Sequence, residues 1–153
     1  MKEKLAPIHP GMTSKDTIAV RAATTEHHEF LATHDHHVRP EVLASLIDAG
    51  QILVVEAEGE PLGWLRWNLF WDEIPFMNLL FVLGEQRALG LGRALVDAWE
   101  TTLREQGHKL VLTSTQADED AQHFYRKLGW TDCGALLLPG DPTEIIFRKV
   151  LTE

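Results

Sequence analysis

The sequence contains a single cysteine, Cys133, so no disulfide can form within the chain. Such sparing use of cysteine is typical of the reducing cytoplasm, and without a partner motif we expect Cys133 to be a packed thiol, not a nucleophile. No apolar run approaches the roughly 20 residues that a membrane-spanning helix needs. The first residues also lack the apolar stretch of a signal peptide. We therefore expect a cytoplasmic protein without a membrane partner.

Basic residues are few as well. The chain has 14 lysines and arginines against 23 aspartates and glutamates, which gives a net charge of −9. An acidic chain repels phosphate backbones and no basic stripe is present, which argues against a nucleic-acid partner. An acidic surface suits a cationic acceptor such as an amine, but it also keeps many cytoplasmic proteins soluble.

The hydrophobic periodicity predicts one domain over residues 17–153, preceded by a loose arm over residues 1–16. Helices are expected within residues 24–50, with a break near Pro40, over residues 90–106, and after Asp118, a good N-cap. Strands are expected over residues 17–21, 51–57, 62–71, 74–83, 109–113, 131–138 and 144–151. This order predicts an α/β (α+β) fold with a mixed sheet and helices on its faces.

The segment RALGLG at residues 87–92 connects a predicted strand directly to an amphipathic helix. The first turn of a helix has unpaired N–H groups and a partial positive charge. Glycines let a bulky anion approach that backbone closely, and Arg87 and Arg93 add positive charge. These properties suit a pyrophosphate, although a tight turn alone would also explain the glycines. The spacing matches neither a P-loop nor the G-x-G-x-x-G fingerprint.

The same segment resembles the pyrophosphate motif Q/R-x-x-G-x-G/A of the GNAT superfamily of acyl-CoA-dependent N-acyltransferases, with Arg87, Gly90 and Gly92 at its fixed positions. The resemblance covers residues 17–151. Ala88 and Gly84 depart mildly from the family pattern. The resemblance implies a mostly antiparallel sheet of about seven strands flanked by about four helices. It also implies that acetyl-CoA binds to Phe81, Val82, Leu83, Arg87, Ala88, Leu89, Gly90, Leu91, Gly92 and Arg93.

A second segment, QHFYRKLGW at residues 122–130, resembles the family's other signature and places its tyrosine at Tyr125. Spacing alone favours a packing role for Tyr125, because it lies on an apolar stripe with Phe124 and Leu128. The resemblance implies that Tyr125 is the general acid that protonates the leaving thiolate. The family often has Asn where this chain has Asp118, so no binding role is assigned to Asp118.

The general base is harder to assign. Many family members use a glutamate on the fourth strand, and Asn78 occupies that place here. An amide cannot accept a proton as a base, so we expect Asn78 to orient the acceptor or to hold a water molecule. Asp72 and Glu73, the nearest carboxylates in sequence, are expected to lie in a solvated turn.

Two clusters of side chains remain. Five histidines crowd residues 27–37 without a paired-ligand motif, so we expect a solvated surface and no metal, although one of them could touch the acceptor. The five aromatic residues between residues 64 and 76 are expected mostly in the core, and the rest could line an acceptor pocket.

Together these patterns predict an N-acetyltransferase that moves an acetyl group from acetyl-CoA directly to an amine. A coenzyme A-binding regulatory or interaction module without turnover is the rival interpretation, and an unrelated α/β domain with a chance glycine turn is a third. The acceptor could be a small amine, an amino acid, an antibiotic or a protein N-terminus. Family habit suggests a homodimer.

Overall fold

A computed structural model describes residues 17–84 and 89–152 and shows one seven-stranded sheet with the strand order β1-β2-β3-β4-β5-β7-β6. The predicted N-terminal arm, residues 1–16, lies outside the described residues. The strands are β1 (Ile18–Ala22), β2 (Ile52–Ala57), β3 (Glu60–Phe70), β4 (Ile74–Val82), β5 (Leu110–Gln116), β6 (Thr131–Leu136) and β7 (Glu144–Val150). The α-helices are α1 (His28–His34), α2 (Pro40–Asp48), α3 (Leu91–Glu105) and α4 (Ala121–Lys127), and the 3₁₀ turn η2 (Thr25–His27) precedes α1.

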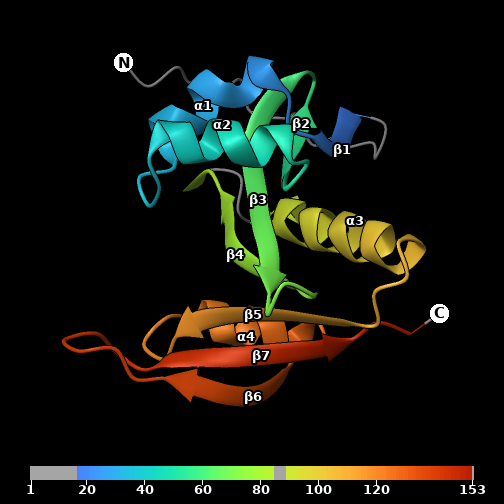
Figure 1. Ribbon diagram of the computed structural model, residues 1–153. Coiled ribbons are helices and arrows are strands. Elements are labelled where there is room, and N and C mark those ends of the chain that lie inside the picture. Colours follow the sequence, from blue (N-terminus) through green and yellow to red (C-terminus); the bar gives the residue numbers. More distant parts are fainter. Residues whose placement is uncertain (1–16, 85–88, 153) are drawn as a thin grey trace.

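Every neighbouring pair of strands is antiparallel except β4 and β5, which are parallel. Figure 1 shows the sheet in two parts, with β1–β4 beside α1 and α2 and with β5–β7 beside α4. The predicted mixed, mostly antiparallel sheet of seven strands with four helices is confirmed.

Two apolar clusters cover the two faces of the sheet. The larger cluster packs the buried stripe of α3, formed by Leu91, Leu95, Trp99 and Leu103, against the sheet, and it also includes Tyr125 of α4. The smaller cluster packs Leu31 of α1 and Leu43 of α2 against the other face. We call these the α3–α4 face and the α1–α2 face. The helical spacing of the α3 stripe had predicted its burial.

Two polar contacts join the two parts of the sheet. The Lys149 ammonium on β7 lies 2.9 Å from Oε1 of Glu100 on α3. The hydroxyl of Thr113 on β5 donates a hydrogen bond of 2.9 Å to the main-chain carbonyl of Met77 on β4. Because both contacts are buried or partly buried, they help to set how the two parts meet.

Two predictions about the C-terminal half were wrong. Asp118 is not the N-cap of α4, because the chain first makes a turn in which the Glu119 N–H donates to the Gln116 carbonyl, and the helix begins at Ala121 after Asp120. Cys133 is exposed and not packed, because β6 is the edge strand of the sheet and pairs with β7 alone. Its side chain consequently has a strand neighbour on one side and solvent on the other.

Candidate active site at the split between β4 and β5

The sheet opens at one position. Strands β4 and β5 share two residue pairs, Phe76 with Leu112 and Met77 with Thr113. The next residue of β4, Asn78, is the extra residue of a β-bulge, because the pairing with β3 passes from Met77 directly to Leu79. A bulge bends its strand and changes the direction of the following side chains. The end of the β4–β5 ladder therefore coincides with a bend in β4.

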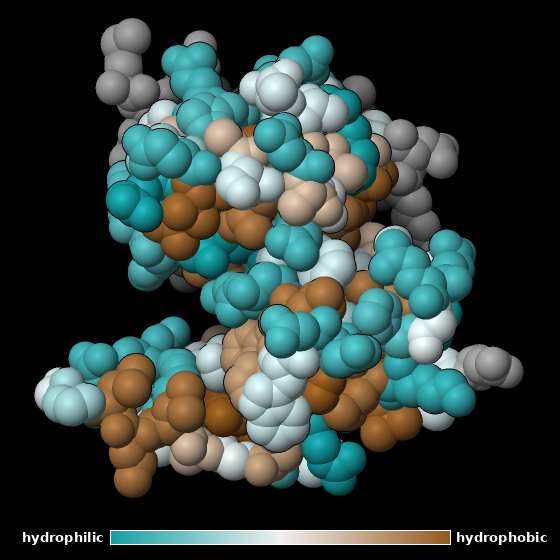
Figure 2. All heavy atoms as spheres, in the orientation of Figure 1, coloured by the Kyte–Doolittle hydropathy of each residue, from teal (hydrophilic) through white to brown (hydrophobic). Residues whose placement is uncertain are grey.

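A pocket of about 390 Å³ lies at this split. Figure 2 shows a notch between the part of the molecule with α1 and α2 and the part with β5–β7. The pocket is lined by His37, Arg66, Met77, Asn78, Leu79, Leu80, Thr113, Ser114, Thr115, Gln116, Glu119, Ala121, Tyr125 and Glu144. Since Leu79 packs in the α1–α2 cluster and Leu80 in the α3–α4 cluster, the lining includes residues from both faces of the sheet.

Tyr125 lines the pocket from the α3–α4 face. Its ring packs 5.9 Å from the ring of Phe147 on β7, and 6% of the residue is exposed. Burial raises the pKa of its hydroxyl to about 12, although a hydrogen bond with Thr113 opposes the rise. A hydroxyl with this pKa keeps its proton at neutral pH and can donate it or a hydrogen bond to an anion in the pocket.

The opposite side of the pocket is polar. Asn78 donates a hydrogen bond of 2.7 Å from its amide to the Asn68 side chain, so this contact holds its orientation. Arg66 donates from Nε to the buried carboxylate of Asp35 at 2.7 Å, and Trp64 donates to the same oxygen at 3.1 Å. Burial favours the neutral form of Asp35, but these hydrogen bonds and the Arg66 charge outweigh it and hold the pKa of Asp35 below its usual range.

The first turn of α3 presents backbone N–H groups. Gly90 precedes the helix in the left-handed region, with φ of 75°, and no side chain of residues 17–84 and 89–152 caps the helix. The first turn contains no acidic residue, so no carboxylate within that turn neutralises the positive end of the helix dipole. A β-carbon at Gly92 would point toward Phe124, Val82 and Leu80, at 3.6 to 3.9 Å. Glycine therefore leaves room between α3, β4 and α4.

The glycines at the start of α3 and the tyrosine that lines the pocket belong to the two segments on which the sequence resemblance rests. The family model for the acetyltransferase (GNAT) family matches residues 19–130. The chain belongs to this family. Within the GNAT family, the curated relatives include two mycothiol acetyltransferases. The one from Arthrobacter sp. (strain FB24) is 28% identical over 142 residues, and the one from Paenarthrobacter aurescens (strain TC1) is 37% identical over 87 residues.

These relatives are much longer than this GNAT chain. The matched segments cover 86% and 53% of this chain but 43% and 27% of the Arthrobacter and Paenarthrobacter proteins. The chain thus spans less than half the length of either relative.

Solved structures show the same GNAT fold. Ard1 from Thermoplasma volcanium matches with a TM-score of 0.79 at 19% identity over 90% of this chain and 99% of its own. N-acetylglutamate synthase from Neisseria gonorrhoeae, solved with coenzyme A and N-acetyl-glutamate, matches with a TM-score of 0.76 at 15% identity over 89% of this chain and 35% of its own. At these identities the likeness concerns the fold.

The predicted GNAT site residues fall into three groups. Tyr125 and Asn78 both line the pocket. The described members of the predicted coenzyme A site lie at the end of β4, on the segment before α3 and on its first turn: Phe81, Val82, Leu83, Leu89, Gly90, Leu91, Gly92 and Arg93. Arg87 and Ala88, also predicted to bind coenzyme A, lie outside the described residues. The Arg93 side chain is 70% exposed and lies 3.8 Å from the Asp97 carboxylate, so its charge remains available to a phosphate.

Sequence reasoning missed several pocket residues. Glu144, Gln116 and Ser114 face the pocket from β7 and β5, and Glu119 reaches it from the loop before α4. None of them belongs to a sequence motif. They could have been identified only by knowing that Gln116 pairs with Glu144 in the sheet. Asp72 and Glu73 are exposed in the turn before β4 and do not line the pocket, in agreement with the expected solvated turn.

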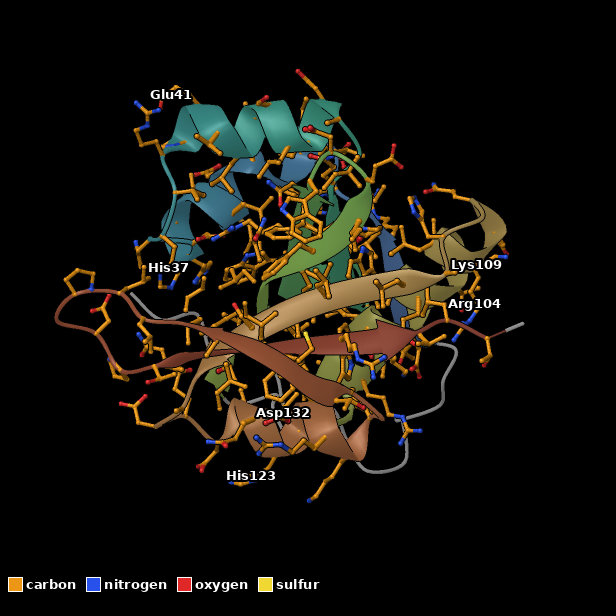
Figure 3. The ribbon with its side chains drawn as sticks, turned by 60° about the horizontal axis from the view of Figure 1, so that its bottom comes forward. His37, Glu41, Arg104, Lys109, His123 and Asp132 are labelled. Carbon is orange, nitrogen blue, oxygen red and sulfur yellow. The ribbon has the colours of Figure 1, made fainter. Side chains whose placement is uncertain are left out.

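The histidines point in different directions. His27 is buried and accepts a hydrogen bond of 2.9 Å at Nδ1 from the Thr24 N–H, whereas His37 lines the pocket. Figure 3 shows His37 on the connection between α1 and α2, on the same side of the molecule as the β6–β7 hairpin. Within residues 17–84 and 89–152, no group of three or more His, Cys, Asp or Glu side chains could hold a metal ion. In the same part of the chain, no helix is long and apolar enough to cross a membrane.

The cluster of aromatic residues mostly packs, as expected. Trp64 is fully buried and the ring of Trp67 lies 6.1 Å from that of Trp99, whereas Phe70 and Trp71 are exposed. The expectation that some of them line the pocket was wrong, because the lining contains none of the five: Trp64, Trp67, Phe70, Trp71 and Phe76. The lining comes instead from other residues of β3 and β4, from β5 and β7, from the α1–α2 connection, and from α4 and the loop before it.

Proposed function

We propose that this chain transfers an acetyl group from acetyl-CoA to an amine by direct attack, with Tyr125 as the general acid. The observation that carries the proposal is the position of Tyr125, buried beside the split between β4 and β5 and lining the pocket there. An acyl thioester lying in the split would have its sulfur within reach of a hydroxyl that stays protonated at neutral pH.

Acetyl-CoA fits the start of α3. The N–H groups of its first turn, the missing side chains at Gly90 and Gly92, and the exposed charge of Arg93 suit a pyrophosphate. The end of β4 at Phe81, Val82 and Leu83 lies beyond its ladder with β5 and would accompany the pantetheine arm. A structural neighbour of the same fold was solved with coenzyme A, which supports the assignment.

The acceptor would enter from the α1–α2 face, where His37, Arg66 and Asn78 line the pocket. The curated relatives are mycothiol acetyltransferases, but this chain covers less than half of each, so their acceptor is not transferred to it. The proposed acceptor class is therefore an amine. Asn78 would orient the amine or a water molecule with its carbonyl oxygen, since its amide group already binds Asn68.

We also infer a homodimer from the family resemblance, and a cytoplasmic location from the sparing use of cysteine. Exposed apolar side chains at and after the end of β6 support the homodimer, because packing against a second copy would bury them: 47% of Leu136, 83% of Leu137 and 51% of Leu138 are accessible. Light scattering on the purified chain would measure the oligomeric state.

The experiment that tests the function has two arms. Thermal unfolding with and without acetyl-CoA measures binding, because a ligand that binds the folded state raises the melting temperature. Release of free thiol is then measured with phenethylamine, lysine, kanamycin and a hexapeptide with a free N-terminus. Stabilisation with thiol release that depends on an amine supports the transferase. Stabilisation without such release supports a coenzyme A-binding module, and no stabilisation contradicts both.

A further inference from the structure

The pocket has an ionisable group on the side opposite Tyr125. Glu144 is the first residue of β7 and pairs with Gln116 of β5, and both residues line the pocket. The pairing of β7 with β5 is regular from Glu144 to Val150. Side chains alternate along a regular strand, so Glu144 and Phe147 point to opposite faces of the sheet. Since Tyr125 packs on Phe147, Glu144 lies on the α1–α2 face and Tyr125 on the α3–α4 face.

The environment of Glu144 suits a group that takes up protons. Burial raises the pKa of its carboxyl above the usual range, the negative charges of Glu119 and Asp141 raise it further, and a hydrogen bond with Ser114 opposes them. A carboxylate with a raised pKa is a stronger base than an exposed one. Among residues 17–84 and 89–152, no lysine, arginine or histidine forms an ion pair with it.

The other acidic groups near the pocket are less suited. Asp35 is held by Arg66 and Trp64, so its oxygens already accept hydrogen bonds from charged and neutral donors. Glu119 is exposed and lies on the loop that leads into α4. Of the carboxylates in residues 17–84 and 89–152 that line the pocket, Glu144 alone comes from a strand on the α1–α2 face, where the acceptor would enter.

We propose that Glu144 accepts the proton that the acceptor ammonium must lose before it attacks the thioester, directly or through one water molecule. The inference rests on the proposed acetyl transfer. The ammonium nitrogen gives one proton to Glu144, and its lone pair forms the C–N bond while the C–S bond breaks. The nitrogen then loses a second proton, which replaces the one that Tyr125 gives to the sulfur. The products are an amide, a free thiol and one proton released from Glu144 to solvent.

Glu144 and Tyr125 lie on opposite faces of the sheet, and this arrangement suits the proposed proton transfers. The amine and its proton acceptor lie on one face of the sheet, and the leaving sulfur and its proton donor lie on the other. The nucleophile can then lose its proton to one side chain while the leaving group receives a proton from another, so neither side chain has to act as both base and acid.

The test compares Glu144→Gln with the wild type on the amines named above. We expect kcat/KM to fall by about 100-fold or more, as the loss of a general base does. We also expect the rise of kcat/KM with pH that reports the ionisation of Glu144 to disappear. Stabilisation by acetyl-CoA should be unchanged. Hydroxylamine, which is mostly unprotonated at neutral pH, should lose much less rate in the variant, because it needs no base before attack.

Asp141→Asn is the matched control, since it changes a carboxylate to an amide at a residue that does not line the pocket. Removing the Asp141 charge lowers the pKa of Glu144, so the acidic limb of the pH profile should move to lower pH while the plateau rate stays within about twofold. The other titratable and charged groups facing this region are Glu119, His37 and the Arg66–Asp35 pair, and they remain in both variants.

The outcomes separate the two proposals. A wild type that transfers acetyl groups and a Glu144→Gln variant with the same rate and the same pH profile would overturn the role of Glu144 and leave the proposed function standing. An equal loss with hydroxylamine and with the ammonium acceptors would also overturn it, because the defect would then be independent of proton removal. A wild type that binds acetyl-CoA but acetylates no amine would overturn both.

Discussion

Thr113 donates its hydroxyl proton to the main-chain carbonyl of Met77 at 2.9 Å, at the last residue pair that β4 and β5 share. This bond lies where the two strands part, directly beside the pocket, and Thr113 also contacts the Tyr125 hydroxyl. One side chain therefore closes the base of the split and holds the hydroxyl proposed as the general acid.

Thr113→Val keeps the shape of the side chain but removes the donor to Met77. The buried carbonyl then lacks its hydroxyl partner, which costs about 1 to 3 kcal/mol in the free energy of unfolding. Urea unfolding would measure the loss. Thr113→Ser is the matched control and should retain most of the stability, because its hydroxyl can make the same bond. Equal stability of the Val variant and the wild type would show that the bond contributes little.

Tyr125→Phe should fold and bind acetyl-CoA but lose turnover by about 100-fold, the usual contribution of a general acid. Since burial raises the pKa of Tyr125 to about 12, the wild-type hydroxyl keeps its proton through neutral and mildly alkaline pH. We therefore expect no loss of kcat from tyrosine ionisation below about pH 10, where an exposed tyrosine would begin to titrate. Steady-state kinetics from pH 6 to pH 10 would test both statements, and a Phe variant with unchanged kcat would contradict the assignment.

Gly92→Ala should fold as well as the wild type but bind acetyl-CoA about tenfold more weakly. The new β-carbon would meet its neighbours at ordinary contact distances of 3.6 to 3.9 Å, so packing tolerates it. It would, however, occupy space that an anion needs to approach the first turn of α3. Isothermal titration with acetyl-CoA measures the affinity.

Gly90→Ala provides the contrast at the same motif. Gly90 has φ of 75°, a conformation that costs an alanine roughly 1 to 2 kcal/mol. This variant should lose stability in thermal unfolding without acetyl-CoA, whereas Gly92→Ala should not. If both variants lost stability equally, the role of Gly92 would be one of packing.

Asp35→Asn should destabilise the fold by about 3 to 5 kcal/mol, because it leaves the buried guanidinium of Arg66 without its counter-charge. The pKa of Asp35 is lowered in the folded state, so its ionised form stabilises the protein above the unfolded pKa of about 3.9. That contribution is lost as the pH falls below about 4. Chemical unfolding at pH 7 and pH 3 should show a smaller difference in the variant than in the wild type. Replacing both partners, as Asp35→Leu with Arg66→Met, should cost less than Asp35→Asn alone.

Cys133 should react with Ellman's reagent in the native protein as fast as in the unfolded chain, with one thiol per chain, since it is exposed on the edge strand β6. Slow labelling that needs denaturant would show that the thiol is covered in solution. Cys133→Ser should retain full activity, because Cys133 does not line the pocket. This variant also removes the protein's own thiol from assays of thiol release.

Several features followed from the sequence because they depend on residues close together in the chain. The buried stripe of α3 repeats at helical spacing, and it predicted both the helix and its inward face. The glycines at 90 and 92 and the signature around Tyr125 are local motifs, and they indicated the family before any contact was known. The start of α4 was predicted less accurately, because a turn follows β5 and the helix begins after Asp120, not after Asp118.

The tertiary structure decided what depends on strand order. Glu144 reaches the pocket because β7 lies between β5 and β6 in the sheet. This order pairs Glu144 with Gln116, and hydrophobic periodicity does not reveal a pairing between residues so far apart in the sequence. The same order places β6 at the edge and leaves Cys133 in solvent. Asn78 lies at the split because a bulge bends β4 there. The sequence thus determined the elements, the family and the proposed acid, whereas the pairing of distant strands determined which carboxylate faces that acid across the sheet.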